Sequence, residues 1–199
     1  MKLYGITGFY CAGKNYVASL FALKGFAVLD VDKLGHLATE NKKSEIIECF
    51  GKDILNESGS IDRRKLGSMV FGKSNTDKLT RLEGIIHPEA NRLTEEWLLE
   101  NKDKDCLVNA ALLHKSSVFS RLTCVIIVRS PLWERLLRAR KRDHLSWVEI
   151  IHRFSTQKFN LKKIYKFADI VCIYNKSAFK SRKYLEKQVD VFLWKRKSY

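Results

Sequence analysis

The first 32 residues constrain the fold of this chain more than any other segment. Residues 2–8, KLYGITG, form an apolar run of the kind that makes a buried strand. The segment KNYVASLFALKG, which begins at Lys14, has apolar residues at helical spacing and ends at Gly25. Residues 26–32, FAVLDVD, are a second strand-like run. A strand, a glycine-bearing loop, a helix and a strand form a βαβ unit, which predicts a parallel sheet.

The rest of the chain continues this alternation. Apolar runs at residues 106–113, 122–128 and 169–175 predict three more strands, so we expect a sheet of five. Helical patterns cover residues 33–101, broken at 51–64, and then 131–143, 146–168 and 180–197. Buried strands that alternate with helices predict an α/β fold, a three-layer sandwich around a parallel sheet. The helical segments at 33–101 and about 131–165 are excursions from that sheet.

The composition is typical of one compact domain inside a cell. The chain has 199 residues, and 45% of them are hydrophobic, as in an ordinary globular protein. No apolar run is long enough to cross a bilayer, and we expect no secretion signal at the amino terminus. The five cysteines are an odd number and form no C-x-x-C pair, which argues against a disulfide framework or a zinc site. We therefore expect a cytoplasmic protein.

The net charge of +15 predicts an anionic partner without selecting one. Nucleic acid, an anionic membrane and a small polyanion would all be attracted, and a solvated lysine-rich surface is the simplest alternative. The chain has no recognisable nucleic-acid motif, and its aromatic residues fall in apolar periodic positions. We expect small-molecule substrates, no nucleic acid, no membrane, and a monomer or weak homo-oligomer.

The loop GFYCAGKN differs by one residue from the phosphate-binding pattern G-x-x-x-x-G-K-[ST]. Gly8, Gly13 and Lys14 are in register, directly after a strand and at the start of a helix. Such a loop turns its backbone N–H groups toward an anion, the helix adds its positive end, and the lysine reaches the β- and γ-phosphates. This context favours nucleotide binding over a purely structural turn.

Asn15 stands where the pattern has the hydroxyl that ligates Mg²⁺. Its amide oxygen can still face the metal, directly or through a water, because hard cations accept neutral oxygen ligands. We expect weaker metal binding, not its loss.

Asp30 and Asp32 are the candidates for a general base, because they end the second predicted strand and ligands bind at the carboxyl ends of parallel strands. A carboxylate there accepts the proton of an acceptor hydroxyl, which is typically worth about 10²–10⁴-fold in rate. The alternative is an N-cap for the helix that begins near Lys33. We favour Asp32 as the base.

The segment RLLRARKRD places Arg135, Arg138 and Arg142 on one helix face. The next predicted helix carries Arg153 and Gln157. Arginines on a mobile lid neutralise the charge that develops during phosphoryl transfer. A solvated helix face is the alternative.

A series of short blocks resembles the dephospho-coenzyme A kinase family. The opening GITGFYCAGKNYVASLFALKGFAVLDVDKLGH resembles the family's loop, helix and D-x-D strand, with a histidine four residues on, His36. CFGKDILNESGSIDRRKLGSMVF, LEGIIHPEA, RLLRARKRD, RFSTQ and ADIVCIYN resemble later blocks of the family, in the same order and over nearly the whole chain.

This resemblance implies a P-loop kinase fold that transfers the γ-phosphate of ATP to the ribose 3′-hydroxyl of dephospho-coenzyme A, with ATP and Mg²⁺ as cofactors. It implies a core at about 1–36, 102–130 and 166–199, a helical coenzyme A-binding region at about 37–101 and a lid at about 131–165. Asp32 matches the base. The positions that match the binding site for the acceptor also include His36, Arg63, His87 and Pro88. The positions that match the nucleotide-binding site are Gly8, Cys11, Ala12, Gly13, Lys14, Asn15, Tyr16, Arg138 and Arg142.

The chain departs from the family at two places. In the loop, Cys11 and Ala12 replace small residues, Asn15 replaces the hydroxyl and Tyr16 replaces a threonine, so the curl of the loop is expected to change at Cys11. On the third strand, ALLHK replaces P-L-L-x-E, with Lys115 for the glutamate, and Asn109 occupies an upstream acidic position. We expect His114 to mark an altered turn, and not a metal ligand.

Three functional alternatives stay open from the sequence. The first is a working dephospho-coenzyme A kinase, and the second is a catalytically impaired homologue that binds nucleotide or coenzyme A. The third is a P-loop kinase of another small hydroxyl acceptor. The combination of Lys14, Asp32, Arg138 and Arg142 favours the first, because a binding relic would have little need for the base.

Overall fold

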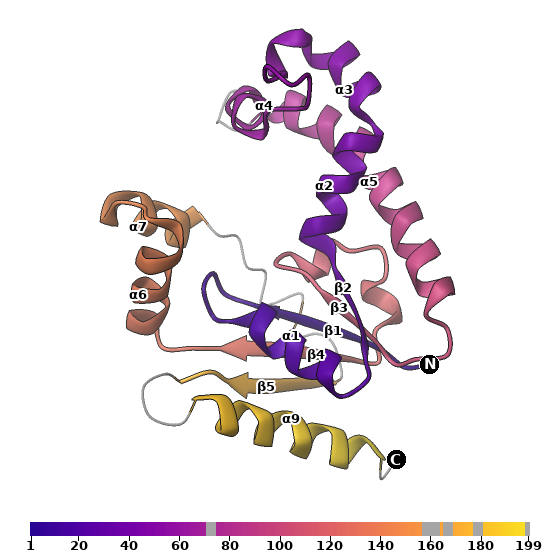
Figure 1. The fold of residues 1–199 in the computed structure, drawn as a ribbon, viewed down its shortest axis with the longest axis vertical. Coiled ribbons are helices and arrows are strands. Elements are labelled where there is room, and N and C mark those ends of the chain that lie inside the picture. Colours follow the sequence, from indigo (N-terminus) through magenta and orange to yellow (C-terminus); the bar gives the residue numbers. More distant parts are fainter. Residues whose placement is uncertain (71–74, 157–163, 165–168, 177–180, 198–199) are drawn as a thin grey trace. The chain divides into compact units, whose positions relative to one another are not determined.

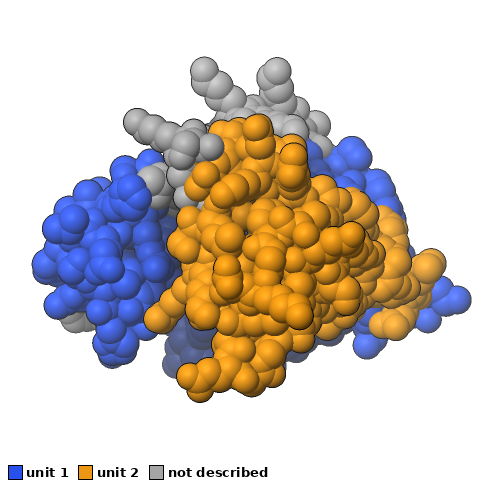
Figure 2. Space-filling view, turned by 90° about the horizontal axis from the view of Figure 1, so that it is seen from above, with its two compact units in different colours: residues 1–30, 101–199 blue, residues 31–100 orange. Residues whose placement is uncertain are grey.

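The computed structural model of the chain describes residues 1–70, 75–156, 164, 169–176 and 181–197. By its internal contacts the chain divides into unit 1, Met1–Asp30 with Asn101–Tyr199, and unit 2, Val31–Glu100. Figure 2 colours the two units separately. The functional boundaries predicted for a core, a coenzyme A-binding region and a lid stay predictions.

Unit 1 is built on a parallel sheet of five strands, which confirms the predicted α/β fold (Figure 1). The strand order is β2-β3-β1-β4-β5. The strands are β1 (Leu3–Gly8), β2 (Ala27–Asp30), β3 (Cys106–Asn109), β4 (Cys124–Arg129) and β5 (Ile170–Tyr174). The central strands β1, β3 and β4 are almost entirely buried, as their continuous apolar sequences predict.

The helices of unit 1 include α1 (Lys14–Leu23) and α9 (Ser181–Lys197), which pack with the sheet around one apolar core. In Figure 1 α9 runs along β5. In that core the ring of Phe192 packs against two others. Its centroid lies 5.7 Å from that of Tyr4 and 5.5 Å from that of Phe21. Two further helices, α6 (Leu132–Asp143) and α7 (Trp147–Thr156), follow β4, and two 3₁₀ turns, η2 (Leu113–Lys115) and η3 (Phe119–Arg121), follow β3.

Unit 2 is helical and has a core of its own. Its elements are α2 (Val31–Asn41), α3 (Lys43–Phe50), η1 (Lys52–Ile54), α4 (Arg63–Val70) and α5 (Thr76–Glu100). Ile46, Ile54 and Val70 are buried at the centre of this small core. The pair Asn41–Glu89, with 2.7 Å between Nδ2 and Oε1, joins α2 to α5.

Two strands end earlier than the sequence pattern predicts. The second strand stops at Asp30, and α2 begins at Val31, so the expectation that Asp30 and Asp32 both end a strand is wrong: Asp32 lies in the first turn of α2. The third strand stops at Asn109, and the apolar residues after it form a connection to η2. In both places an apolar side chain at the end of the run extended the strand pattern beyond the hydrogen-bonded ladder.

No helix in the described part of the chain has both the length and the apolar character needed to cross a bilayer.

Candidate functional site

The loop between β1 and α1 takes its shape from two glycines that leave no room for a side chain. A Cβ added to Gly13 would lie 2.2 Å from Nδ2 of Asn175, and one added to Gly8 would lie 2.7 Å from the carbonyl oxygen of Val128. Gly13 also has a φ of 92°, a conformation that glycine adopts without strain. The glycines that the motif predicted are therefore required by close packing within unit 1.

Cys11 and Ala12 complete the turn of this loop. Cys11 has a φ of 57°, so a residue with a side chain holds the left-handed conformation that favours glycine. Ala12 is buried, and its N–H donates to the carbonyl oxygen of Phe9 at 2.9 Å. The Ala12 carbonyl accepts from Asn175 Nδ2 at 2.9 Å. Asn175 follows β5 and lies with the loop at the carboxyl ends of the parallel strands, where it holds the loop in place.

Lys14 lies in a cluster with two amide side chains. Its Nζ donates to Asn15 Oδ1 at 3.0 Å and to Asn109 Oδ1 at 3.1 Å, and Asn109 Nδ2 donates to Asn15 Oδ1 at 3.1 Å. Asn109 is buried at the carboxyl end of β3, where it is in register with Asp30 on β2. The three residues that the sequence linked to phosphate and metal handling therefore lie together.

The metal-binding capacity of this cluster rests on neutral oxygens. Asn15 Oδ1 and Asn109 Oδ1 are oxygen donors of the type that Mg²⁺ accepts, and both already accept hydrogen bonds from Lys14. Within the described residues, no group of three or more His, Cys, Asp or Glu side chains is placed to hold a metal ion. The altered turn expected at His114 is the 3₁₀ turn η2, which also contains Lys115.

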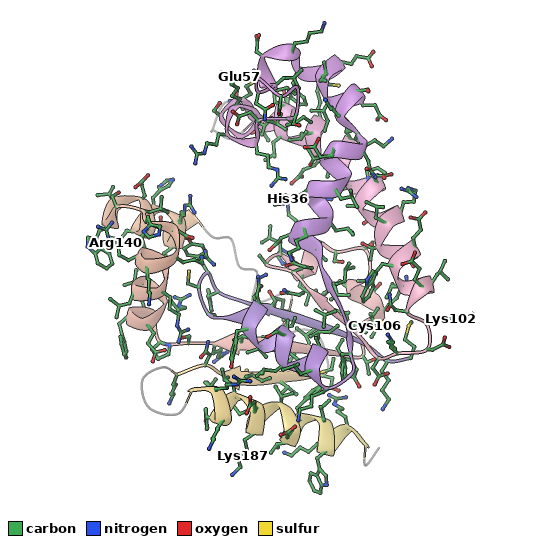
Figure 3. All side chains as sticks on the ribbon, in the orientation of Figure 1. His36, Glu57, Lys102, Cys106, Arg140 and Lys187 are labelled. Atoms are coloured by element: carbon green, nitrogen blue, oxygen red, sulfur yellow. The ribbon has the colours of Figure 1, made fainter. Side chains whose placement is uncertain are left out.

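Arg138 of α6 reaches the phosphate loop directly. Its Nη1 lies 3.4 and 3.5 Å from the carbonyl oxygens of Cys11 and Ala12, and its Nη2 donates to Glu134 Oε2 at 2.6 Å. Glu134 is itself buried, so the guanidinium is held in a fixed position by charge-assisted hydrogen bonds. Arg140, labelled in Figure 3, lies on the same helix but stacks on Trp147 of α7, 5.9 Å from the ring centroid.

Arg142 lies over Tyr10 of the loop, with 5.2 Å between its Cζ and the ring centroid. Its Nε and Nη2 donate to the two carboxylate oxygens of Asp143 at 2.7 and 3.0 Å. This ion pair, with the Tyr10 hydroxyl hydrogen bond, lowers the pKa of Asp143 to about 2, so the carboxylate is ionised at neutral pH.

Arg135 is enclosed by two aromatic rings. Its Cζ lies 4.9 Å from the ring centroid of Phe9 in the loop and 4.9 Å from that of Phe154 in α7. Burial lowers the pKa of this guanidinium from its ordinary value. The predicted arginine face of α6 thus meets the loop at all three positions. Arg153 of α7 joins it through Tyr10, whereas Gln157 lies outside the described residues.

The remaining predicted residues are exposed. Tyr16 lies in the first turn of α1, with 41% of its surface accessible. In unit 2, the side chains predicted for the acceptor lie on three helices: Asp32 and His36 on α2, Arg63 at the start of α4, and His87 next to Pro88 on α5. His36 is labelled on α2 in Figure 3.

Phe9, Tyr10, Asp143 and Asn175 are site residues that the sequence reasoning did not assign. Asn175 ends a block that resembles the family, yet nothing local indicates that it packs on Gly13. For Phe9 and Tyr10 the sequence did hold one signal. Two large aromatic side chains in a glycine loop need a surface to pack against, which indicates that another element covers the loop.

Comparison with known proteins gives consistent matches over most of the chain. A family model described as dephospho-CoA kinase matches residues 2–180. A dephospho-CoA kinase of Fusobacterium nucleatum is 33% identical over 86% of this chain and 88% of its own length. One of Thermus thermophilus is 36% identical over 77% of this chain and 73% of its own length.

A solved crystal structure of a Thermus thermophilus protein has the same fold. It superposes with a TM-score of 0.80 at 30% identity, and covers 98% of this chain and 97% of its own. The fold of this chain is therefore similar to one already determined by crystallography.

Proposed function

The chain belongs to the dephospho-CoA kinase family, and from this premise we propose how its residues divide the family's reaction. That reaction is the transfer of the γ-phosphate of ATP to the ribose 3′-hydroxyl of dephospho-CoA, which gives coenzyme A and ADP. The observation that carries the assignment is the meeting of Lys14, Arg138 and Arg142 at one glycine loop of a parallel sheet.

The loop binds the phosphates of ATP. Backbone N–H groups from Gly8 to Tyr16, at the positive end of α1, supply donors whose placement the glycines and Asn175 fix. Lys14 supplies a charge. Asn15 and Asn109, which accept hydrogen bonds from Lys14, are neutral amides, so phosphate oxygens replace either of them without breaking an ion pair to that residue. The cluster thus supports a lysine that is oriented before the nucleotide arrives.

Arg138 and Arg142 neutralise charge on the transferred phosphoryl group. Arg138 is held by the buried Glu134, whereas Arg142 has a side chain that is 60% exposed. Phosphoryl transfer requires little covalent chemistry from the protein, so two placed guanidinium groups are a large part of what it supplies.

Asp32 is the general base that takes the proton of the acceptor hydroxyl. It is exposed in the first turn of α2, two residues beyond the end of β2. His36, Arg63 and His87 bind the acceptor, and their exposed polar side chains support contact with a large polyanion.

Mg²⁺ is the second cofactor that we propose. Asn15 would hold it, directly or through a water, with Asn109 beside it. Both residues offer neutral amide oxygens, so they fit a hard cation weakly. When bound, the ion neutralises phosphate charge.

All five cysteines are free thiols, which supports the cytoplasmic location that we propose.

The replacement Asp32→Asn tests this assignment. We expect kcat to fall by about 10²–10⁴-fold, because the amide cannot accept the proton, while the Kd for ATP changes little. Steady-state phosphorylation of dephospho-CoA and calorimetric ATP binding measure the two quantities.

The matched control is Asp77→Asn. Asp77 is also an exposed aspartate in the first turn of a helix, α5, so it reproduces the effect on the helix dipole without the proposed chemistry. Equal kcat values in the wild type and Asp32→Asn would remove Asp32 as the base.

A further inference from the structure

The phosphate loop is tied to α6 and α7 by the side chain of Tyr10. Its ring packs edge-to-face on Phe154 at 5.3 Å between centroids and lies beneath the guanidinium of Arg142. Its hydroxyl donates to Asp143 Oδ2 and accepts from Arg153 Nη1 at 3.4 Å. One loop residue thus contacts both arginine-bearing helices.

Asp143 links Tyr10 to the two arginines. The carboxylate receives two hydrogen bonds from Arg142, and its Oδ2 lies 3.8 Å from Nη1 of Arg153. Asp143 directly follows Arg142 at the end of α6. Of these groups, Tyr10 alone comes from the loop, so it fixes the arginines relative to the phosphate-binding backbone.

We propose that Tyr10 is a positioning residue of the nucleotide site, which holds Arg142 beside the phosphate loop through Asp143. The proposal rests on the role given above to Arg142 and names the residue that places it. The Arg142 side chain is long and 60% exposed, so without such a contact its guanidinium group would sample many rotamers. Because the guanidinium group of Arg142 is ordered in advance, nucleotide binding and phosphoryl transfer do not have to offset the loss of its rotamer entropy.

The protonation states support this geometry. Burial and the hydrogen bond to Asp143 raise the pKa of Tyr10, so its hydroxyl remains a donor at neutral pH. The low pKa of Asp143 keeps the acceptor ionised over the same range. The hydrogen bond between them is therefore charge-assisted.

The replacement Tyr10→Phe tests the proposal, because it keeps the ring and removes the hydroxyl. We expect kcat/KM for ATP to fall roughly tenfold, the size of a lost hydrogen bond to a charged group, with KM for dephospho-CoA unchanged. Asp143→Asn weakens the same bond from the other end, and we expect a similar loss. Tyr184→Phe, at an exposed tyrosine of α9, is the control and keeps wild-type kinetics.

A double-mutant cycle separates positioning from a structural role. In an Arg142→Met background, Tyr10→Phe should change kcat/KM for ATP less than twofold, because the group that it positions is gone. Additive losses, or wild-type kinetics in Tyr10→Phe or Asp143→Asn, would overturn the positioning role alone. Wild-type kinetics in Arg142→Met would instead overturn the proposed role of Arg142, and the positioning role with it. Thermal unfolding of each variant confirms that it is folded.

Discussion

The phosphate loop of unit 1 and the predicted acceptor residues of unit 2 are built in opposite ways. The loop is a backbone structure, fixed by Val128 on β4, Asn175 after β5, Asn109 on β3 and Arg138 on α6. The residues predicted for the acceptor, Asp32, His36, Arg63 and His87, have side chains exposed on three helices.

This difference separates two ways of binding a polyanion. In the proposed function the loop binds phosphate through its closely packed backbone, so a small steric change there is expected to act on folding and binding together. Exposed side chains of unit 2 act as separate contacts, and removing one is expected to alter substrate affinity with little effect on folding. The predictions below test this separation, from the largest expected effect to the smallest.

The change Gly13→Ala should have the largest effect. The new Cβ would meet Asn175 Nδ2 at 2.2 Å, so the loop must move, and we expect ATP affinity to fall by roughly 10²-fold. The positive φ alone adds a loss of stability of about 1–3 kcal/mol. Calorimetric ATP binding and chemical denaturation measure the two effects.

Its matched control is Gly25→Ala at the end of α1. Gly25 has a φ of 91°, nearly that of Gly13, but no atom lies within 4 Å of its added Cβ. We expect a comparable conformational cost and wild-type ATP affinity. Equal loss of ATP binding in both variants would show that backbone strain, and not contact with Asn175, shapes the loop.

The pair Asn15→Thr and Asn15→Ala tests the altered cluster around Lys14. Threonine restores a hydroxyl ligand, so the Mg²⁺ concentration for half-maximal activity should fall severalfold, whereas alanine should raise it. A Mg²⁺ titration at saturating ATP measures both. Identical titrations in the two variants would place residue 15 outside the reach of the metal.

The change Arg63→Ala tests the acceptor side. We expect KM for dephospho-CoA to rise roughly fivefold to tenfold, the loss of one exposed charge-assisted contact, with little change in kcat or Tm. Arg64→Ala, at the next residue of α4 and also exposed, is the control. If the two variants raise KM equally, the effect is general electrostatic attraction and not a contact specific to Arg63.

The smallest effect concerns the stability of unit 2. Hydrogen bonds from Arg92 and Asn41 lower the pKa of Glu89 to about 2, below an ordinary value near 4.5. A carboxyl group whose pKa is lower in the folded state than in the unfolded state stabilises the fold at every pH above the unfolded-state pKa. This contribution is lost as the pH falls from about 4.5 toward 2. Glu89→Gln should therefore lower Tm by a few degrees at pH 7 and flatten its decline in acid.

Glu96→Gln is the comparison for this prediction. Glu96 pairs with the same Arg92 but is 52% exposed, so we expect a smaller change in Tm at pH 7. Thermal unfolding followed by circular dichroism between pH 7 and pH 3 gives both curves. An unchanged acid slope in Glu89→Gln would show that the ion pair does not contribute to stability.

The sequence predicted those parts of the site that follow from local pattern. Gly8, Gly13 and Lys14 lie in one short segment between a strand and a helix, and the arginines of α6 recur at helical spacing, so their shared face was predictable. The strand order and the end of the second strand could not be predicted from the sequence in the same way. Val31 prolongs an apolar run although it begins a helix, which placed Asp32 on the wrong element.

The contacts that complete the site come from distant segments, and this is why pattern alone did not find them. Asn109 reaches Lys14 because β1 and β3 are neighbours, and Asn175 reaches Ala12 because β5 ends at the same edge of the sheet. Tyr10 meets Asp143 only once α6 has packed beside the loop. Each contact depends on topology that a one-dimensional pattern leaves open.

The contact between Gly13 and Asn175 has a consequence for how such a chain evolves. The two positions are far apart in the sequence, yet they share one small volume. A side chain gained at position 13 would be tolerated only after position 175 has become smaller, and an intermediate with both groups would be selected against. Among descendants of a common ancestor, a side chain at position 13 should therefore occur only together with a smaller residue at position 175.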